Sequence, residues 1–391
     1  MIYKFIEKLN KKKNSKYYFI TPLVYAIGDA CEQIIITSIT KKNKKIILLF
    51  PFFFNKFLKY KIANKFLFKN IIINNFNKSN NLISLIFNFL LNLEFLIKRL
   101  IFIFFPKKLN LKNNEYLSFP YIGIHKIYEE NFIKNSFDEI NPVNISNLNI
   151  TLNKKKKDIC KNILLKNNFL KNKIVCLHVR DSGYKKDFNR KIYRNSNINN
   201  YINLIKYLTE KNYTVFRMGD KTAVPINFSD KNFIDYAHSE INNRLMDLFL
   251  ISECNFFIAN QSGIMETAYM FNKPTLTTNM CEIFCSYPRK ISDRGLFKKM
   301  KMREQDKIIN LLDYIEMDYI KHNPENEIYD FNFIENTEEE LYEAIVEYEN
   351  LITSNKFDLT ENQKKIKEII KNRFRKNLYS DLLSESNMFD K

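Results

Sequence analysis

The stretch KIVCLHVRDSGYKKDFNRKIYRNSNINNYINLIKYLTEKNYTVFRMGD, residues 173–220, contains two short apolar runs that are each followed by polar residues and glycine. The first run covers residues 173–179 and the second covers residues 213–218. Between them, apolar residues recur at spacings of three and four: Ile198, Tyr201, Ile205 and Leu208. That spacing predicts a helix over residues 197–211. A strand, a helix and a second strand predict a βαβ unit, in which the two strands are parallel.

The alternation of strand and helix continues after this unit. The next elements are predicted as a helix over residues 244–252, a strand over 255–259, a helix over 263–271 and a strand over 274–277. Strands that alternate with helices of ordinary length are typical of a doubly wound, Rossmann-like α/β domain.

The first part of the chain carries a shorter version of the same pattern. A strand is predicted over residues 18–27, a turn at Gly28 and Asp29, a helix over 30–38 and a second strand over 45–50. These elements form another βαβ unit, so a parallel sheet is expected there as well.

The chain has 391 residues, and single hydrophobic cores stop growing beyond ~250–300 residues. Residues 139–157 are polar, with an Asn-Pro pair and the run NKKKK, and we place the link between two domains there. We therefore expect domains at residues 1–150 and 151–335, followed by C-terminal helices in residues 336–391.

The C-terminal part opens with Thr337, which is followed three residues later by Glu340. This spacing is a capping box, in which the two residues satisfy exposed N–H groups at the start of a helix. We expect one helix from Thr337 to about residue 352 and a second over residues 361–377, both on the surface.

The charge of the chain is unevenly distributed. The sequence has 62 Lys and Arg against 43 Asp and Glu, for a net charge of +19. Residues 1–150 carry a net charge of +14, residues 151–300 carry +13 and residues 301–391 carry −8. A basic body attracts phosphate-bearing partners such as nucleic acid, anionic lipid or nucleotides. The bias of the whole sequence towards Lys, Asn, Ile and Phe is an alternative source of the charge.

Residues 82–106 are the most apolar stretch of the chain. Polar and charged residues interrupt it: Asn88, Asn92, Glu94, Lys98 and Arg99. It therefore falls short of the ~18 uninterrupted apolar residues that argue for a transmembrane helix. The helical spacing of the interruptions predicts an amphipathic helix. Such a helix either packs on a sheet or lies in the plane of an anionic membrane, where Lys107 and Lys108 would face the lipid.

The six cysteines include no C-x-x-C pair. The pair in CEIFC would be half of a metal site, and the sequence shows no second half, so no metal is expected. The first 16 residues break their apolar positions with charges, and no cleavable signal peptide is visible. We therefore expect a cytoplasmic protein with reduced thiols.

Ligands of open α/β sheets bind beyond the carboxyl ends of the strands, which selects the residues that follow each apolar run. These residues are His178, Arg180, Asp181 and Gly183 after the first run, Gly219 and Asp220 after the second, and Asn260, Gln261, Ser262 and Gly263 after the third. Side chains of these types bind phosphate, ribose or a base, and glycine allows the backbone to approach a ligand closely.

Each candidate has an ordinary structural alternative. Arg180 either binds a diphosphate through two hydrogen bonds or is a surface arginine. His178 either contacts a ligand or bonds within the sheet, and Asp181 and Asp220 are equally suited to caps and turns. The NQSG segment combines a serine hydroxyl with N–H groups that open a helix, which is an anion-binding arrangement. Glu266, one turn into that helix, either is favoured there by the helix dipole or holds ribose hydroxyls.

Several common enzyme motifs are missing from the sequence. It contains no G-x-G-x-x-G and no G-x-x-x-x-G-K-[ST], which argues against dinucleotide oxidoreductases and P-loop enzymes. It also contains no H-E-x-x-H and no G-x-S-x-G, which argues against common hydrolase types.

Five segments resemble a family of bacterial glycosyltransferases that is linked to surface-polysaccharide gene clusters and is distantly similar to GT-B fucosyltransferases. The segments are YAIGDACEQ, VCLHVRDSGY, YRNSNINNYINLIKYLTEKNYTVFRMGD, IDYAHS and MDLFLISECNFFIANQSGIMETAYMFNKP. The resemblance is strong over residues 175–274, suggestive over 18–51 and faint elsewhere. It implies a GT-B fold, in which two Rossmann-like domains face each other across a cleft and the last helices cross back to the first domain.

The resemblance also implies roles for individual residues. In such enzymes the C-terminal domain holds the nucleotide-sugar donor, so Arg180 would bind the donor diphosphate. The residues at the start of the helix after the third strand, Gln261, Ser262 and Gly263, would do the same. Glu266 would meet the ribose, and His178, Gly219 and Asp220 would complete the donor site.

The resemblance places the acceptor on the N-terminal domain. Relatives often carry His where this chain has Asp29, in a loop that follows the first strand and faces the cleft beside Gly28. Asp29 is therefore our candidate for the general base that activates the acceptor hydroxyl. Alternatively, Asp29 caps the helix that follows it. His125, after YIGI, is a second candidate base on the acceptor side.

Taken together, these features predict a GT-B glycosyltransferase that moves a sugar from a GDP- or UDP-linked donor to a glycan or lipid-linked acceptor in surface-polysaccharide biosynthesis. Enzymes of this type bind no cofactor and usually no metal, because cationic side chains and helix dipoles neutralise the leaving diphosphate. A peripheral position on the inner face of the cytoplasmic membrane would suit a lipid-linked acceptor. The alternatives are a basic nucleic-acid-binding protein, for which no module is visible, and a non-catalytic nucleotide-sugar-binding protein.

Overall fold

The computed structural model describes residues 2–51, 62–73, 81–104, 147–169, 172–183, 192–281, 288–304, 306–309, 311, 313 and 331–374. The chain divides into two compact units. Unit 1 consists of Met1–Glu139 with Leu148–Asn153, and unit 2 consists of Ile140–Asn147 with Lys154–Lys391.

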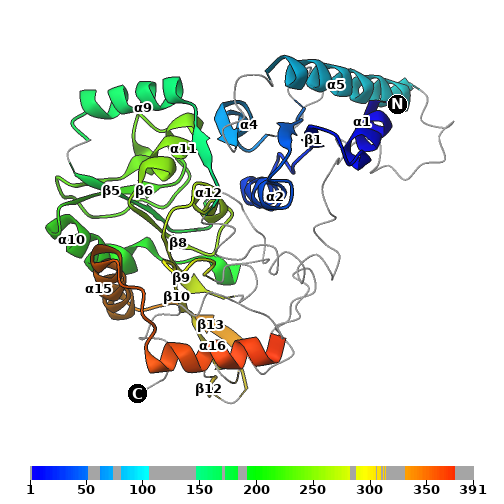
Figure 1. The fold of residues 1–391 in the computed structure, drawn as a ribbon. Coiled ribbons are helices and arrows are strands. Elements are labelled where there is room, and N and C mark those ends of the chain that lie inside the picture. Colours follow the sequence, from blue (N-terminus) through cyan, green and yellow to red (C-terminus); the bar gives the residue numbers. More distant parts are fainter. Residues whose placement is uncertain are drawn as a thin grey trace. The chain divides into compact units, whose positions relative to one another are not determined.

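Unit 2 is built on a six-stranded parallel sheet (Figure 1). Its strands are β5 (Lys173–His178), β6 (Tyr213–Met218), β7 (Phe233–Ile234), β8 (Phe256–Asn260), β9 (Thr275–Met280) and β10 (Arg294–Phe297). They lie in the order β10-β9-β8-β5-β6-β7. This is the order of a doubly wound Rossmann sheet, because the chain first winds from β5 towards β7 and then from β8 towards β10.

Helices cover both faces of this sheet. The helices of unit 2 are α9 (Lys154–Lys166), α10 (Ile202–Glu210), α11 (Arg244–Glu253), α12 (Met265–Met270), α15 (Glu338–Ser354) and α16 (Glu361–Phe374). α10 and α15 pack side by side on one face, whereas α11 and α12 contact β5 and β8 and α9 lies against α11 (Figure 1). Coverage on both sides is the reason that all six residues of β6 are buried.

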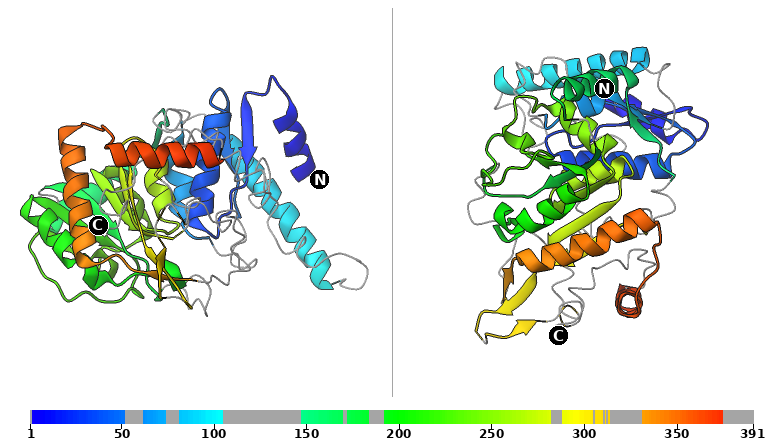
Figure 2. Two further views of the ribbon diagram at one scale, coloured as in Figure 1. Left: turned by 90° about the horizontal axis from the view of Figure 1, so that it is seen from below. Right: turned by 90° about the vertical axis from the view of Figure 1, so that its left-hand side faces the viewer.

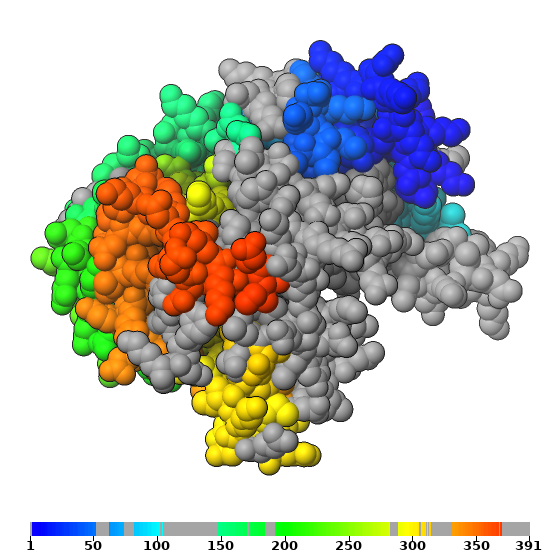
Figure 3. Space-filling view, turned by 60° about the horizontal axis from the view of Figure 1, so that its bottom comes forward, coloured from blue at the N-terminus to red at the C-terminus, as the bar shows by residue number. Residues whose placement is uncertain are grey.

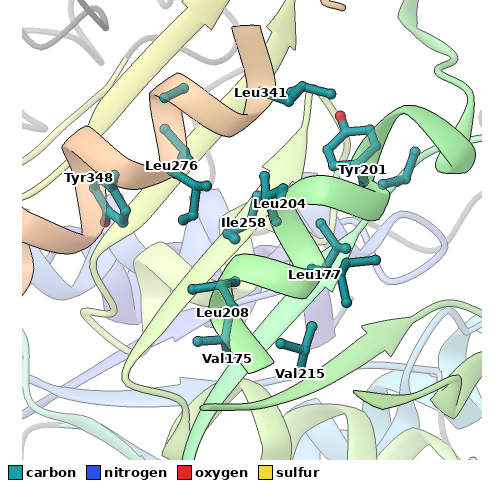
Figure 4. Close-up of a cluster of buried hydrophobic side chains, with 14 of the residues drawn as sticks. Val175, Leu177, Tyr201, Leu204, Leu208, Val215, Ile258, Leu276, Leu341 and Tyr348 are labelled. Atoms are coloured by element: carbon teal, nitrogen blue, oxygen red, sulfur yellow. The ribbon is translucent and has the colours of Figure 1, made fainter. Parts of the chain in front are cut away.

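The core between the sheet, α10 and α15 is apolar and fully enclosed (Figure 4). Val175 and Leu177 of β5 lie against Leu204 of α10, and Leu341 and Tyr348 of α15 complete the cluster. All five side chains are inaccessible to solvent.

The predicted capping box of α15 is confirmed. Thr337 Oγ1 accepts the N–H of Glu340 at 3.2 Å, and Glu340 Oε2 accepts the N–H of Thr337 at 3.0 Å. The prediction that α15 lies at the surface is confirmed for its outer side, whereas apolar residues such as Ile345 recur on its inner side at helical spacing and enter the core. The outer sides of α15 and α16 form part of the surface of unit 2 (Figure 3).

The sequence predicted most strands and helices of unit 2 to within a few residues, but it missed the elements between β9 and α15. Besides β7 and β10, a three-stranded antiparallel sheet was not anticipated: β11 (Lys299–Met302), β12 (Ile308–Ile309) and β13 (Phe331–Ile334). The prediction also opened α12 at residue 263, whereas the helix begins at Met265. Short 3₁₀ turns complete the unit: η2 (Ile192–Arg194), η3 (Ile198–Tyr201) and η4 (Tyr236–His238).

Unit 1 contains the second βαβ motif that the sequence predicted. β1 (Tyr17–Ile20) pairs in parallel with β2 (Lys45–Leu48), and α2 (Ile27–Thr40) connects them. The helix starts earlier than predicted, so that the expected strand over residues 18–27 ends at Ile20 and the expected turn at Gly28 and Asp29 is helical. Within the described residues of unit 1, the other elements are α1 (Ile2–Lys11), α4 (Lys65–Asn70), β3 (Ile71–Ile73), α5 (Asn81–Phe104) and β4 (Ile150–Leu152).

The predicted helix in the most apolar stretch is α5, a long continuous helix (Figure 2). Two of its asparagines bind the chain at the end of β2. Asn88 Oδ1 accepts the N–H of Phe50 at 2.7 Å, and Asn92 Nδ2 donates to the carbonyl of Phe50 at 3.0 Å. One side of α5 is therefore packed on the parallel strand pair. Within the described ranges, no helix combines the length and the apolar character needed to cross a membrane.

Candidate functional site

The winding of the six-stranded sheet reverses between β5 and β8, and ligands of such sheets bind at the carboxyl ends of the strands that flank the reversal. Two hydrogen bonds join the carboxyl ends of β5 and β8 at this edge. Ser262 Oγ lies 3.2 Å from His178 Nδ1, and the N–H of Arg180 donates to Asn260 Oδ1 at 2.7 Å. The structure thus brings together His178, Arg180 and Ser262, which the sequence selected from separate segments.

Arg180 is held at this edge by its backbone and by its guanidinium group. Its N–H bonds to the fully buried Asn260, and its carbonyl accepts the N–H of Ser196 at 2.9 Å. Its Nη1 donates to Asn195 Oδ1 at 2.8 Å. The Asn195 side chain is a neutral amide, and this bond orients the guanidinium at the sheet edge. The arrangement suits the binding of an anion.

His178, the last residue of β5, is half-buried. Burial lowers its pKa from the ordinary 6.5 to about 4, with Asp181 opposing the shift and Arg217 adding to it. The imidazole is therefore neutral at pH 7. A neutral ring can form one hydrogen bond with the Ser262 hydroxyl, and this bond fixes the position of that hydroxyl at the sheet edge.

This pKa predicts that unit 2 becomes less stable as the pH falls from 6.5 to 4. The unfolded chain binds a proton at His178 near pH 6.5, whereas the folded chain binds it only near pH 4. The stability that His178 contributes is therefore complete above pH 6.5 and is lost as the pH falls towards 4, by at most about 3 kcal/mol. Urea unfolding of the wild type and of His178→Gln at about pH 7.5 and about pH 5 measures it.

The comparison with the variant is essential because other groups titrate in the same range. Burial raises the pKa of Asp247 to about 6, which changes stability with pH in both proteins. We expect the wild type to lose more stability than His178→Gln on acidification. An equal loss in the two proteins would contradict the shifted pKa of His178.

The loop after β5 is packed directly against the loop after β6. Asp181 Oδ1 accepts the N–H of Gly183 at 2.9 Å, and its Oδ2 accepts the N–H of Val224 at 2.8 Å. A Cβ atom on Gly183 would lie 1.8 Å from the carbonyl oxygen of Thr222, so only glycine fits there. Asp181 is thus a turn residue that joins two loops, in agreement with its structural alternative.

Arg217 contacts both of these loops, and no motif in the sequence marks it as a candidate. It lies in β6 and is 1% exposed. Its Nη1 is 3.2 Å from each carboxylate oxygen of Asp235, and its Nη2 donates to the carbonyl of Val224 and lies 3.9 Å from Asp181 Oδ2. The sequence does contain one signal for a special role of Arg217. It is the single charged residue in the run 213–218, whose other residues suit a buried strand.

Gly219 and Asp220 shape the loop after β6. Asp220 Oδ1 accepts hydrogen bonds from the N–H and the hydroxyl of Thr222 at 2.9 and 2.5 Å, as in a turn. Gly219 has a φ of +156°, and its carbonyl accepts the Nδ2–H of Asn242 at 2.9 Å. A Cβ atom on Gly219 would lie 3.2 Å from that of Ala237. Contact of either residue with a donor stays a prediction.

The segment after β8 precedes α12 and differs in exposure from residue to residue. Gln261 is 2% exposed, and its Oε1 accepts the N–H of Cys281 at 3.2 Å, which links the ends of β8 and β9. Ser262 is half-buried and Gly263 is exposed. Ser262 and Gly263 are therefore the members of this segment that solvent or a ligand can reach.

Glu266 lies in the first turn of α12 and forms a buried ion pair. Its Oε2 accepts a hydrogen bond from Nη1 of Arg289 at 2.6 Å, and the guanidinium of Arg289 lies over the ring of Tyr269 at 4.8 Å. Both charged side chains are 7% exposed. Contact of Glu266 with ribose hydroxyls stays a prediction, and a ribose would share this carboxylate with Arg289.

Lys298 is a further residue near this edge that the sequence did not reveal. It is 2% exposed, and its Nζ donates to the carbonyls of Tyr193 and Asn195 at 2.8 and 2.7 Å. Burial lowers the pKa of Lys298. Because Asn195 also holds the guanidinium of Arg180, Lys298 fixes the segment that orients Arg180.

The residues predicted for the acceptor side belong to unit 1. Gly28 is buried and Asp29 is half-buried, and both lie in the first turn of α2 rather than in a loop before it. An acidic side chain in a first turn is favoured by the helix dipole. His125 lies outside the described residues. The roles of all three on an acceptor stay predictions.

In the part of the chain that the structure describes, no three His, Cys, Asp or Glu side chains are grouped so that they could hold a metal ion. No family model matches the sequence, and no curated protein matches it significantly. One similar solved structure is the crystal structure of the glycosyl transferase family 9 from Veillonella parvula DSM 2008. It is 10% identical, covers 72% of this chain and 84% of its own, and has a TM-score of 0.35. A likeness at this TM-score carries no inference about this chain.

Proposed function

We propose that unit 2 binds the diphosphate of a nucleotide-sugar donor at the sheet edge between β5 and β8, and that the chain transfers the sugar to an acceptor. The observation that carries the proposal is the placement of Arg180. Its backbone is anchored by Asn260 and its guanidinium is oriented by Asn195, beside the point where the winding of the sheet reverses.

In this proposal Arg180 donates two hydrogen bonds to the diphosphate, as planar guanidinium groups do with phosphate oxygens. The hydroxyl of Ser262, positioned by His178, and the N–H of the exposed Gly263 approach the same phosphates from the β8 side. Positive charge that is fixed before the reaction stabilises the leaving nucleoside diphosphate when the bond to the sugar breaks.

The finer parts of the proposal are supported by the sequence resemblance alone. They are a GT-B arrangement with an acceptor domain at residues 1–150 and a donor domain at 151–335, a glycan or lipid-linked acceptor of surface-polysaccharide biosynthesis, and transfer without a metal. Asp29 or His125 would remove the proton of the acceptor hydroxyl, and Glu266 would bind the ribose.

The test is a thermal-shift panel of GDP, UDP, CDP and their sugar conjugates on the full chain. A ligand that binds only the folded protein and is present at about 100 times its Kd stabilises it by ~2.7 kcal/mol. We expect one nucleoside diphosphate to raise the Tm by several degrees and the other two to act less. If all three leave the Tm unchanged, the donor site is wrong.

A second measurement separates a transferase from a non-catalytic nucleotide-sugar-binding protein. Purified protein that is incubated with the stabilising nucleotide sugar is expected to release nucleoside diphosphate, slowly by hydrolysis and faster with a glycan acceptor. Binding without any release would support the non-catalytic alternative.

A further inference from the structure

Helix α5 of unit 1 exposes large apolar side chains along its whole length. Eight of them are between 43% and 71% exposed: Leu82, Leu85, Ile86, Phe89, Ile97, Leu100, Ile101 and Phe104. The helix has 24 residues and is therefore ~36 Å long. Scattered exposed apolar residues are ordinary, but a continuous patch of this kind marks a contact surface.

All of these residues except Ile101 share one side of the helix. At 100° per residue the seven fall within a sector of about 120° of the circumference, and Ile101 lies about 40° beyond its edge. Every α5 residue within that sector is apolar, and the three charged residues of the helix, Glu94, Lys98 and Arg99, lie outside it. We call this sector the apolar sector of α5.

The opposite side of α5 is bound to the rest of unit 1. Leu91 and Phe95 are 0% and 3% exposed and join the core formed with α1, β1 and β2. Asn88 and Asn92 bond to the backbone of Phe50 on the same side. These contacts hold the side of α5 that lies opposite the apolar sector.

The described part of unit 1 is strongly basic. The described residues of unit 1 include 14 Lys and Arg against four Asp and Glu, which gives a net charge of +10. All four acidic side chains are half-buried. Next to α5 lies α1 (Figure 1), with exposed lysines Lys4, Lys8 and Lys11.

We propose that unit 1 binds the surface of an anionic membrane through the apolar sector of α5, with the helix axis in the membrane plane. The apolar sector enters the boundary between headgroups and acyl chains, and the surrounding lysines meet the lipid charge. A second copy of the chain would bring two basic surfaces together, so charge complementarity favours an anionic lipid surface as the occupant. The proposal uses residues of unit 1 alone and stands whether or not unit 2 binds a nucleotide sugar.

The test is sedimentation of the full chain with vesicles of phosphatidylcholine and phosphatidylglycerol at a mole ratio of about 2:1. The variant is Leu85→Ser/Ile97→Ser, which makes two polar substitutions in the apolar sector. Its control is Leu165→Ser/Ile159→Ser on α9 of unit 2, because those two residues are of the same types and are 50% and 47% exposed, against 53% and 48% for Leu85 and Ile97.

We expect the α5 variant to bind the vesicles about tenfold more weakly than the wild type and the α9 control to bind them within about twofold. Binding should also fall about tenfold on pure phosphatidylcholine, because those vesicles carry no anionic lipid for the lysines to meet. High salt should weaken binding to a similar degree, because it screens the attraction between the lysines and the anionic lipid.

Three results would overturn the proposal. One is equal binding by the α5 variant and the wild type. Another is a wild-type dimer that the α5 variant dissociates in light scattering, which would show that a second copy covers the sector. The third is a large loss of Tm in the α5 variant alone, which would show that another part of this chain covers it.

Discussion

Replacing Arg180 by alanine is expected to weaken binding of the stabilising nucleoside diphosphate by about 30- to 100-fold, or ~2–3 kcal/mol. The guanidinium is held at the sheet edge by Asn195, and its backbone is anchored by Asn260, so a ligand meets a charge that is already in position. Loss of such a cation leaves phosphate oxygens without a partner. Isothermal titration of the wild type and Arg180→Ala with the ligand found in the thermal-shift panel measures the change.

Two further variants sharpen this experiment. Arg303→Ala removes an exposed arginine of the same unit, whose Nε donates to Asn332 Oδ1 at 3.3 Å, and should leave affinity unchanged. Arg180→Lys keeps the charge but loses the planar fork, so it should recover only part of the affinity. Equal affinities for Arg180→Ala and the wild type would exclude Arg180 from the site.

Replacing Arg217 by methionine is expected to destabilise unit 2 by about 3 kcal/mol or more. Methionine preserves much of the volume, so the main loss is the guanidinium that Asp235 and Asp181 face. Carboxylates that lose their buried partner are costly in a partly desolvated site. The free energy of unfolding from urea titration measures the effect, with the m-value as a check on two-state behaviour.

An exposed ion pair provides the control for Arg217. Lys364 Nζ lies 2.6 Å from Glu361 Oε1 on α16, and the two side chains are 56% and 88% exposed. Lys364→Met should change stability by less than about 0.5 kcal/mol, because surface pairs contribute little. The double variant Arg217→Met/Asp235→Asn should lose less free energy of unfolding than the sum of the losses in the two single variants. A loss below about 1 kcal/mol for Arg217→Met would show that the buried arginine is not needed for stability.

The elements that the sequence predicted well are those with a strong local signal. Residues 213–218 form β6 with the predicted bounds, because an apolar run flanked by turn residues has few alternatives in an α/β domain. The capping box at Thr337 and Glu340 is equally local, since its two hydrogen bonds join residues three apart.

The elements that were missed depend on contacts between distant segments. β7 and β12 have two residues each, which is too short for any periodicity, and they are strands only because β6 and β11 lie beside them. The early start of α2 is a second case. Its N-cap residue, Ala26, makes no side-chain capping bond, so the sequence carried no signal for the boundary.

The candidate site shows the same division. By itself, the sequence determined which side chains follow the strands, because apolar runs and their polar ends are local features. It thereby selected His178, Arg180 and Ser262. Only the tertiary structure decided that β5 and β8 are neighbours, which depends on the pairing of segments about 80 residues apart. That pairing places the three residues at the point where the winding reverses, and it turns Arg217 and Lys298 into supports that no local pattern could reveal.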